Sequence, residues 1–243
     1  NAIVWQDKRT TDYCKTLQNQ GVEKEVIEKT GLLLDPYFSA SKLRWINNHF
    51  KEEIVNKNTL FGTIDTFLLW KLTEGAVYAT DVTNAARTSL LNISTLEWDQ
   101  DLIKLFELEK INLPEIKKNA DDFGSTTLFG GKIKISGMAG DQQAALFGQT
   151  CFEAGDIKST YGTGCFLILN TGSQILRSQN KLLSTIGYKI DQEVVYALEG
   201  SIFVAGALIQ WLRDKMKFFV SAPESEALAK TANGNSEIII IPS

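Results

Sequence analysis

The spacing of hydrophobic positions changes near residue 150. Before it, apolar residues recur mostly at the three- to four-residue interval of amphipathic helices; after it, they gather in short runs typical of strands. Helices are expected over 10–20, 22–30, 42–48 and 98–108. Short strands are expected over 1–5, 90–93 and 133–135. The first part is therefore predicted to be mainly helical.

Three polar side chains mark helix ends in this part. Ser39 follows the turn at Asp35-Pro36 and is expected to cap the helix at 42–48, because a serine oxygen accepts from the free N–H groups of a first turn. Asp65 is expected to cap a buried helix that contains Trp70. The single histidine, His49, is expected at the C-terminal end of helix 42–48.

The second part carries four strand candidates at short spacing, followed by a helix. The strands are expected over 157–161, 165–170, 183–188 and 194–198, and the helix over 203–214. Gly162-Thr163-Gly164 lies between the first two and predicts a tight hairpin turn. The pattern alone supports a mixed sheet with helices.

A central stretch, Ser136 to Gly148, joins the two parts. A β-branched run stops at Gly137 and Gly140, and Asp141 then opens a helical pattern. Asp141 is either a plain helix cap or a functional carboxylate at a helix N-terminus. A second glycine turn at 162–164 adds weight to function, because two glycine turns that each break a strand suit a phosphate site between backbone loops.

Composition narrows the classes of function. The 243 residues carry a net charge of −4 with a pI near 5.2, which gives no basic surface for nucleic acid. Three cysteines and one histidine argue against a disulfide framework, a zinc site or a histidine-based triad. No apolar run has the length of a membrane span, so a cytoplasmic protein is expected. The ends begin and stop abruptly, and a strand over 237–242 would need a partner, which suggests an internal portion of a longer chain.

One motif points to a family. Tyr37-x-Ser-x-x-Lys-Leu-x-Trp-Ile-x-Asn-His49 matches the first signature of the FGGY carbohydrate kinases at each specified position, and the Gly-Asp141-Gln stretch and Trp5 also match. The chain thus resembles this family over nearly its whole length. The resemblance implies an α/β fold with mixed sheets, of the ribonuclease-H-like or actin-like ATPase kind, with two domains and a cleft between them. Residues 1–150 would be the remainder of the N-terminal, polyol-binding domain, and residues 151–243 the first part of the C-terminal, nucleotide-binding domain.

The resemblance also implies roles for single residues. Asp141 would be the general base and would contact the substrate together with Gln142. Trp5, Tyr37 and Phe166 would form the walls of a pocket that suits glycerol, since aromatic faces pack on carbons while polar groups take hydroxyls. The nucleotide would be contacted by Thr163, Gly206 and Gln210. Without the family, these eight residues would be assigned to a helix cap, a first-turn glutamine, core aromatics, a hairpin turn, a packing glycine and a surface glutamine.

The implied activity is transfer of the γ-phosphoryl group of ATP to glycerol, with Mg²⁺ as the accompanying ion and ADP as the second product. No metal ligand is assigned within the chain, because the family's main magnesium partner lies upstream of residue 1. A homodimer or a dimer of dimers is implied. The alternatives are another FGGY kinase acting on a ketopentose or similar polyol, a non-catalytic polyol or nucleotide sensor, and a chaperone or filament ATPase of the actin-like superfamily.

Overall fold

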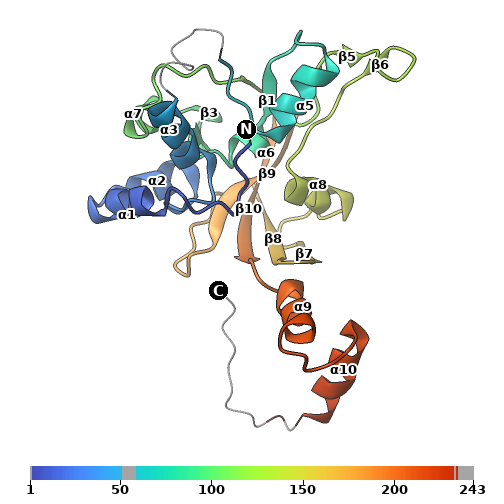
Figure 1. Ribbon diagram of the computed structural model, residues 1–243. Helices are drawn as coiled ribbons and strands as arrows, with labels where there is room; N and C mark the ends of the chain where they lie inside the picture. Colours follow the sequence, from blue (N-terminus) through green and yellow to red (C-terminus); the bar gives the residue numbers. More distant parts are fainter. Residues whose placement is uncertain (1, 51–58, 233, 235–243) are drawn as a thin grey trace.

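The computed structural model describes residues 2–50, 59–232 and 234 (Figure 1). Three helices come first: α1 (Thr11–Asn19), α2 (Glu23–Thr30) and α3 (Ser39–His49). They gather on one side of the molecule together with the short helix α7 (Gln100–Leu105) (Figure 1). Their apolar faces meet in one buried cluster that includes Leu17, Val26, Leu43, Leu102 and Phe106. This cluster is the largest core of the first part.

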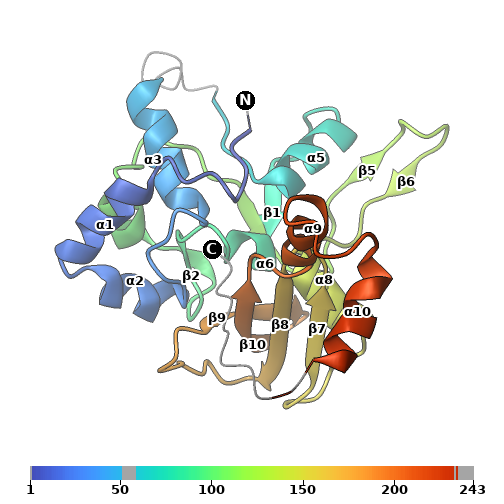
Figure 2. The ribbon, with the colours of Figure 1, turned by 60° about the horizontal axis from the view of Figure 1, so that its bottom comes forward.

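Short strand pairs connect these helices to the centre. The strands β1 (Ala79–Asp81) and β4 (Glu115–Lys117) pair in parallel, while β2 (Leu91–Asn92) with β3 (Glu97–Trp98), and β5 (Ser125–Thr126) with β6 (Ile133–Lys134), are antiparallel hairpins. The helices α5 (Ile64–Leu72) and α6 (Val82–Ala85) flank β1. The hairpin β5–β6 projects from the molecule beside α5 (Figure 2).

The second part is built on one antiparallel sheet. Its strands are β7 (Ile157–Tyr161), β8 (Cys165–Gly172), β9 (Leu183–Ile190) and β10 (Glu193–Ile202), in the spatial order β7-β8-β10-β9. The helix α8 (Asp141–Gly148) packs against β7, β8 and β9, and α6 packs against β9. The helices α9 (Gly206–Asp214) and α10 (Ala222–Thr231) follow the last strand, pack on each other and extend away from the end of the sheet (Figure 1). A core of Val82, Ala85, Leu91, Ile93 and Ile186 joins the first part to this sheet.

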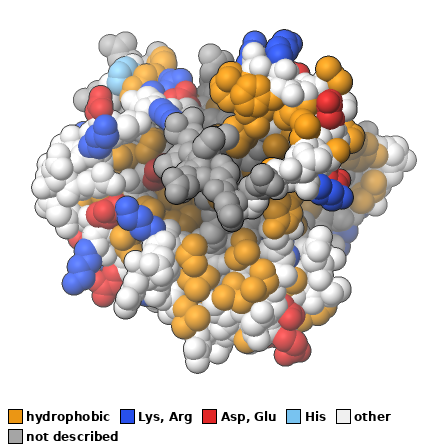
Figure 3. All heavy atoms as spheres, turned by 90° about the horizontal axis from the view of Figure 1, so that it is seen from below, with side chains coloured by type: hydrophobic (Ala, Val, Ile, Leu, Met, Phe, Trp, Pro, Cys, Tyr) orange, Lys and Arg blue, Asp and Glu red, His pale blue; other side chains and the backbone are white. Residues whose placement is uncertain are grey.

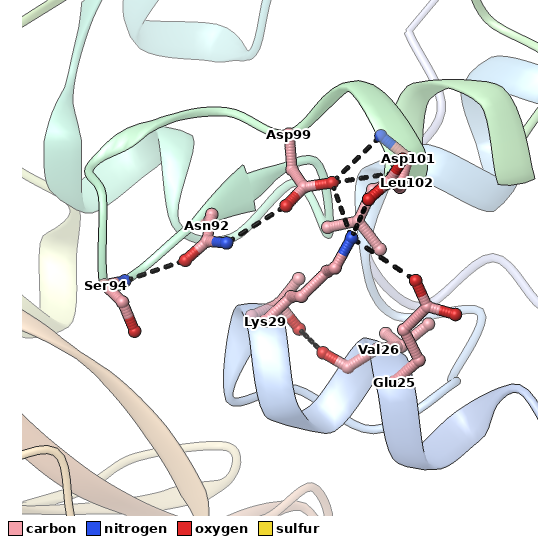
Figure 4. Close-up of polar contacts among 9 residues, drawn as sticks. Glu25, Val26, Lys29, Asn92, Ser94, Asp99, Asp101 and Leu102 are labelled. Carbon is pink, nitrogen blue, oxygen red and sulfur yellow. Dashed lines mark hydrogen bonds and ion pairs between the residues drawn. The ribbon is translucent and has the colours of Figure 1, made fainter.

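A polar cluster around Lys29 fastens α2 to α7 (Figure 4). The ammonium lies 3.0 Å from the carboxylate of Asp99, 2.6 Å from that of Asp101 and 3.3 Å from that of Glu25. Asp99 is also the N-cap of α7, where it accepts from the backbone N–H groups of Asp101 and Leu102. One carboxylate thus serves both the helix start and the contact between helices.

The two expected caps are wrong. Phe38 precedes α3 as its N-cap residue and Ser39 is already helical, with no side-chain cap bond. Asp65 lies inside α5, whose N-cap is Thr63, and its carboxylate accepts from the Thr80 hydroxyl at 2.6 Å instead. A partner on β1 thus takes the oxygen that the local pattern assigned to the helix start.

Other expectations from the pattern also need correction. The helix α5 is not buried as a whole: Phe67 is 50% exposed, and only Thr66 and Leu69 on it are buried. The stretch 2–5 forms no strand; among the described residues, its one backbone–backbone hydrogen bond is a turn from Asp7 N–H to the Val4 carbonyl at 3.1 Å. The helix expected over 98–108 is limited to α7, because Trp98 is in β3; the helix expected from residue 203 begins at 206. The strand expected over 237–242 lies outside the described residues.

The remaining elements match the expectation closely. All four strands of the second part are present, and the turn at 162–164 joins β7 to β8. His49 ends α3, where its ring stacks on Trp45 at 4.0 Å between centroids. In the part of the chain that the structure describes, no helix is both long and apolar enough to cross a membrane.

Candidate active site

A hollow of about 180 Å³ brings four of the predicted site residues together. Its lining comes from the N-terminal segment, α3, α6, α8 and β10, and consists of Trp5, Tyr37, Ser39, Asn84, Arg87, Gly140, Asp141, Gln142, Gln143 and Glu199. It is smaller than the pockets that hold drug-sized ligands, so it suits a compact molecule. Aromatic faces, carboxylates and amides share its wall, which suits a ligand with both carbon and hydroxyl surface.

Three aromatic rings pack together at the hollow, and two of them, Trp5 and Tyr37, line it. Trp5 and Tyr37 meet edge to face with centroids 5.5 Å apart, and Phe203 stacks on Tyr37 at 5.5 Å and contacts Trp5 at 5.6 Å. Phe166, the third predicted wall residue, lies on β8 opposite Thr160 and Ser201 and is not among the residues that line the hollow. The structure therefore brings Trp5 and Tyr37 together and adds Phe203 to them.

An ion pair between two lining residues, Arg87 and Glu199, forms part of the wall. Arg87 donates to the Glu199 carboxylate at 2.8 Å, and the two residues are 112 positions apart in the chain. The side chains of Glu199 and Arg87 are 2% and 19% exposed, so this pair ties the segment after α6 to β10 through a largely buried contact. The guanidinium also lies 5.8 Å from the centre of the Tyr37 ring. Burial raises the pKa of Tyr37, although the nearby Arg87 charge acts in the opposite direction.

Asp141 stands at the start of α8 with its carboxylate exposed. It is the first helical residue, after the N-cap Gly140, and one of its oxygens accepts from the Gln142 N–H at 2.8 Å. It is therefore not the cap of α8, and its carboxylate is open to a ligand at the positive end of the helix. Gly140 has φ −60°, an ordinary value that does not need a glycine; a Cβ there would lie 2.6 Å from Oε1 of Gln143, so the end of that side chain would have to move.

A buried carboxylate fixes the loop that precedes Asp141. Asp81 is fully buried and accepts from the Thr83 hydroxyl and from Asn119 Nδ2, the latter at 2.8 Å. The Thr83 hydroxyl in turn accepts from the Gly140 N–H at 2.9 Å. Burial raises the pKa of Asp81, against the hydrogen bonds that Thr83 donates to it. The network links β1 and α6 to the turn, and so sets where the Asp141 carboxylate stands.

Gln142 is held from the side of the sheet. Its Oε1 accepts from the ammonium of Lys158 on β7, and the same ammonium donates to the Thr160 hydroxyl at 2.9 Å. Lys158 is 2% exposed. Burial lowers its pKa, while the nearby charges of Asp141 and Glu199 act in the opposite direction. Lys158 lies outside the sequence motif, yet it contacts Gln142 of the motif directly and is influenced by the charge of Asp141.

The second glycine turn is packed against the start of α9. The amides of Gly206 and Ala207 donate to the carbonyls of Gly162 and Thr163 at 3.0 and 3.2 Å. A Cβ on Gly206 would lie 2.5 Å from the Gly162 carbonyl oxygen, and one on Gly164 would lie 2.7 Å from that of Ile202. The glycines therefore allow backbone segments to meet.

Backbone donors remain at this turn. The Gly162 amide donates to the Gly164 carbonyl at 2.8 Å, while the amides of Thr163 and Gly164 have no backbone acceptor among the described residues. Two adjacent free N–H groups in a glycine turn are suited to an anionic oxygen. Gln210 is exposed on α9, one helical turn after Gly206.

The described residues hold no group of three or more His, Cys, Asp or Glu side chains that could bind a metal by themselves. Magnesium commonly takes one or two protein carboxylates and completes its coordination with water and phosphate oxygens. The exposed carboxylate of Asp141 fits that limited role.

A larger hollow of about 320 Å³ lies elsewhere, around Lys117, Lys118 and Lys189, with Glu115, Asp121 and Asp191 also in its wall. It contains none of the predicted site residues and no aromatic side chain. Its lysines and carboxylates balance in charge. We therefore take the smaller hollow as the candidate site.

Comparison with known proteins decides the family. The model of the N-terminal domain of the FGGY family of carbohydrate kinases matches residues 1–148, and the model of its C-terminal domain matches residues 157–237. The chain belongs to the FGGY family of carbohydrate kinases. Glycerol kinases from Marinomonas sp. (strain MWYL1) and Rhizobium meliloti (strain 1021) are 53% and 54% identical to it; each match covers 100% of this chain and 50% of the relative. The chain spans about half the length of the curated relatives it matches.

Solved structures agree on the fold. The crystal structure of Plasmodium falciparum glycerol kinase with ADP matches with a TM-score of 0.87 at 38% identity, covering 96% of this chain and 47% of that one. The ligand-bound xylulose kinase from Lactobacillus acidophilus matches with a TM-score of 0.81 at 23% identity and covers 96% of this chain and 48% of its own. The predicted α/β fold of the actin-like ATPase kind is thereby confirmed for this FGGY kinase chain.

Several residues of the site escaped the sequence reasoning. Arg87, Phe203 and Glu199 line or support the hollow, and Lys158 contacts Gln142. Lys158 gave no signal in the sequence, because only the folded sheet shows that this strand position is buried. The contact between Arg87 and Glu199 also gave no signal in the sequence, because the two residues are 112 positions apart.

Proposed function

We propose that the complete protein is an ATP-dependent glycerol kinase that makes sn-glycerol 3-phosphate. The observation that carries the proposal is the hollow in which the Asp141 carboxylate and Gln142 stand beside the ring pair Trp5–Tyr37. Over half-length alignments, the relatives at 53% and 54% identity are glycerol kinases, which supports glycerol over a ketopentose. The hollow is small and has both polar and aromatic walls, which also supports a small polyol as the ligand.

In the proposed mechanism, the residues of the hollow bind and orient the acceptor. The rings of Trp5 and Tyr37 cover the carbon side of glycerol, while Asp141 and Gln142 contact its hydroxyls. Asp141 takes the proton from the attacking hydroxyl. Phosphoryl transfer is loose in character, so a carboxylate of ordinary basicity in the right place is sufficient. Phe166, for which the structure gives no contact with the hollow, stays a predicted wall residue.

The nucleotide is assigned to the second glycine turn. The free amides of Thr163 and Gly164 would hold phosphate oxygens of ATP, and Gly206 and Gln210 would line the cleft on the nucleotide side. Magnesium, when bound, would neutralise charge on the phosphates near Asp141. We assign polyol binding to residues 1–150 and nucleotide binding to 151–243, with closure of the cleft between them excluding water. A cytoplasmic enzyme, as a homodimer or a dimer of dimers, completes the proposal.

The test uses the complete protein with ATP and a panel of glycerol, xylulose, ribulose and gluconate. Glycerol is expected to support the fastest ATP consumption. Asp141→Asn is expected to lower kcat about 100- to 10,000-fold, because it removes a general base, with an unchanged melting temperature. Asp12→Asn is the matched control, since Asp12 is also an exposed first-turn aspartate, on α1. Unchanged turnover in Asp141→Asn would contradict the assigned base, and faster turnover with another polyol would contradict the substrate.

A further inference from the structure

Lys158 is buried without the partner that usually accompanies a buried lysine. It is the only buried residue of β7, and no carboxylate lies within ion-pair distance of its ammonium among the residues described. Lysine is rarely buried unless paired, since its charge loses its hydration. Its hydrogen bonds go instead to the neutral oxygens of Gln142 and Thr160. Burying this charge costs free energy, and the buried ammonium contacts a residue that lines the candidate site.

The sheet register shows why the ammonium faces the site. Lys158 on β7 lies opposite Ile168 on β8, and Ile168 lies opposite Glu199 on β10. The three side chains therefore form a row across the buried face of the sheet, against which α8 packs. Glu199 lines the hollow at one end of this row, and Lys158 reaches Gln142 at the other.

The contact with Lys158 fixes which end of the Gln142 amide the ligand meets. An ammonium has three donors and no acceptor, so only Oε1 of the glutamine can face it. The Nε2 group is then turned away from Lys158, and Gln142 lines the hollow. Without Lys158, the amide could rotate and present either its oxygen or its nitrogen.

We propose that Lys158 is a positioning residue that makes Gln142 a hydrogen-bond donor toward the acceptor substrate. This inference rests on the proposed function of the site and adds to it a requirement on the ligand: the atom opposite Gln142 is an acceptor, such as the oxygen of a polyol hydroxyl. Through Thr160, two residues before Gly162, the same ammonium also ties Gln142 to the strand that leads into the phosphate turn.

The test is Lys158→Met in the complete protein, with KM measured separately for glycerol and for ATP. The KM for glycerol is expected to rise about 3- to 10-fold, because an amide that can present either end donates to the ligand for only part of the time and has lost one hydrogen bond. The KM for ATP is expected to stay within about twofold of wild type, a split that general loss of structure would not produce. Lys134→Met, at an exposed strand lysine on β6, is the matched control and should change neither value.

A double-mutant cycle isolates the contact. Gln142→Ala alone should raise the KM for glycerol at least as far as Lys158→Met, and the double variant should be no worse than Gln142→Ala, because Lys158 acts through Gln142. Additive effects, or an unchanged KM for glycerol in folded Lys158→Met, would overturn the proposal. Should that variant unfold, Lys158→Gln decides instead: its side chain is shorter by one bond, so a smaller rise is expected and no rise contradicts us.

Failure of the proposed function gives a different result. Wild-type protein would then show no glycerol-dependent turnover, and the same variants are compared with whichever polyol supports turnover. If none does, calorimetric titration with glycerol replaces KM. In either case, weaker binding of the polyol by Lys158→Met than by wild type supports the positioning role, and equal binding overturns it. This outcome does not depend on which polyol is the substrate.

Discussion

The parts of the chain before and after residue 150 bury their apolar side chains differently. The first part encloses a core of its own, in which Phe106 and Leu102 are at most 1% exposed. In the second part α9 and α10 contain no buried residue, and Ile157 and Leu167 stand exposed on the sheet. Hydrophobic side chains gather in patches on the face drawn in Figure 3.

The core of the second part is also shared. Ile186 of β9 packs with Val82 and Leu91 from the first part, and Leu146 of α8 packs with Ile168 and Ala197 of the sheet. The sheet is thus covered on the side facing the candidate site, while large apolar residues remain open elsewhere. We infer from this difference that the fold of the second part is stabilised to a large extent by its contacts with the first part.

The largest effect is expected in the core of the first part. Phe106→Ala should lower the free energy of unfolding by about 3–5 kcal/mol, because the removed ring leaves a cavity among buried neighbours. Chemical denaturation of the complete protein measures it. A loss below about 1 kcal/mol would show that this core is loosely packed and would remove the contrast between the two parts.

An intermediate effect is expected at the Lys29 cluster. Lys29→Met should cost about 1–2 kcal/mol, since the side chains of Lys29 and Asp99 are 20% and 10% exposed, whereas Asp101 is 77% exposed and adds little. Burial acts to raise the pKa of Asp99, but the hydrogen bonds from Asn92 and Lys29 outweigh it and hold the pKa below the ordinary 3.8.

This lowered pKa sets a pH window. The contribution of Asp99 to stability is present above pH 3.8 and is lost as the pH falls from there through the folded-state pKa. The difference in unfolding free energy between wild type and Lys29→Met should therefore shrink below about pH 3.8. A difference that is constant down to pH 2 would contradict the role of the ion pair.

The smallest effect is expected on α9. Trp211 is 47% exposed, so Trp211→Ala should change the free energy of unfolding of the complete protein by less than about 0.5 kcal/mol. A loss of 2 kcal/mol or more would mean that this helix face is covered in the complete protein. The comparison between the two parts would then hold only for the residues described.

Local patterns predicted the sheet of the second part well, because alternation and glycine turns are encoded within a few residues. They failed at α5, where the hydrophobic run around Phe67 and Trp70 indicates burial although only Leu69 and Thr66 find covering residues. The prediction of Asp65 as a cap is wrong because its hydrogen-bond partner, Thr80, is 15 residues away and cannot be seen in the local pattern.

The residues of the candidate site also differ in whether the sequence could predict them. Trp5, Tyr37, Asp141 and Gln142 could be named from their family motifs, and they do meet at one hollow. Arg87, Glu199 and Lys158 could not, since their importance arises from pairs that only the folded sheet brings together. Phe203 illustrates the limit: the sequence pattern places it at the start of a helix, and nothing local shows that it follows β10 directly and that its ring stacks on Tyr37.

The tight contact between the turn at 162–164 and the first residue of α9 has a mechanical consequence. The backbone of Gly206 lies so close to the Gly162 carbonyl that a methyl group would not fit between them, and backbone hydrogen bonds from Gly206 and Ala207 join the helix to the loop. Displacing the helix relative to the loop would break these bonds, so we expect the two to move together. Under the proposed function, a hinge that brings the nucleotide side toward the acceptor side would then flex at another point of the backbone, and the γ-phosphate would be carried by the same displacement as the helix.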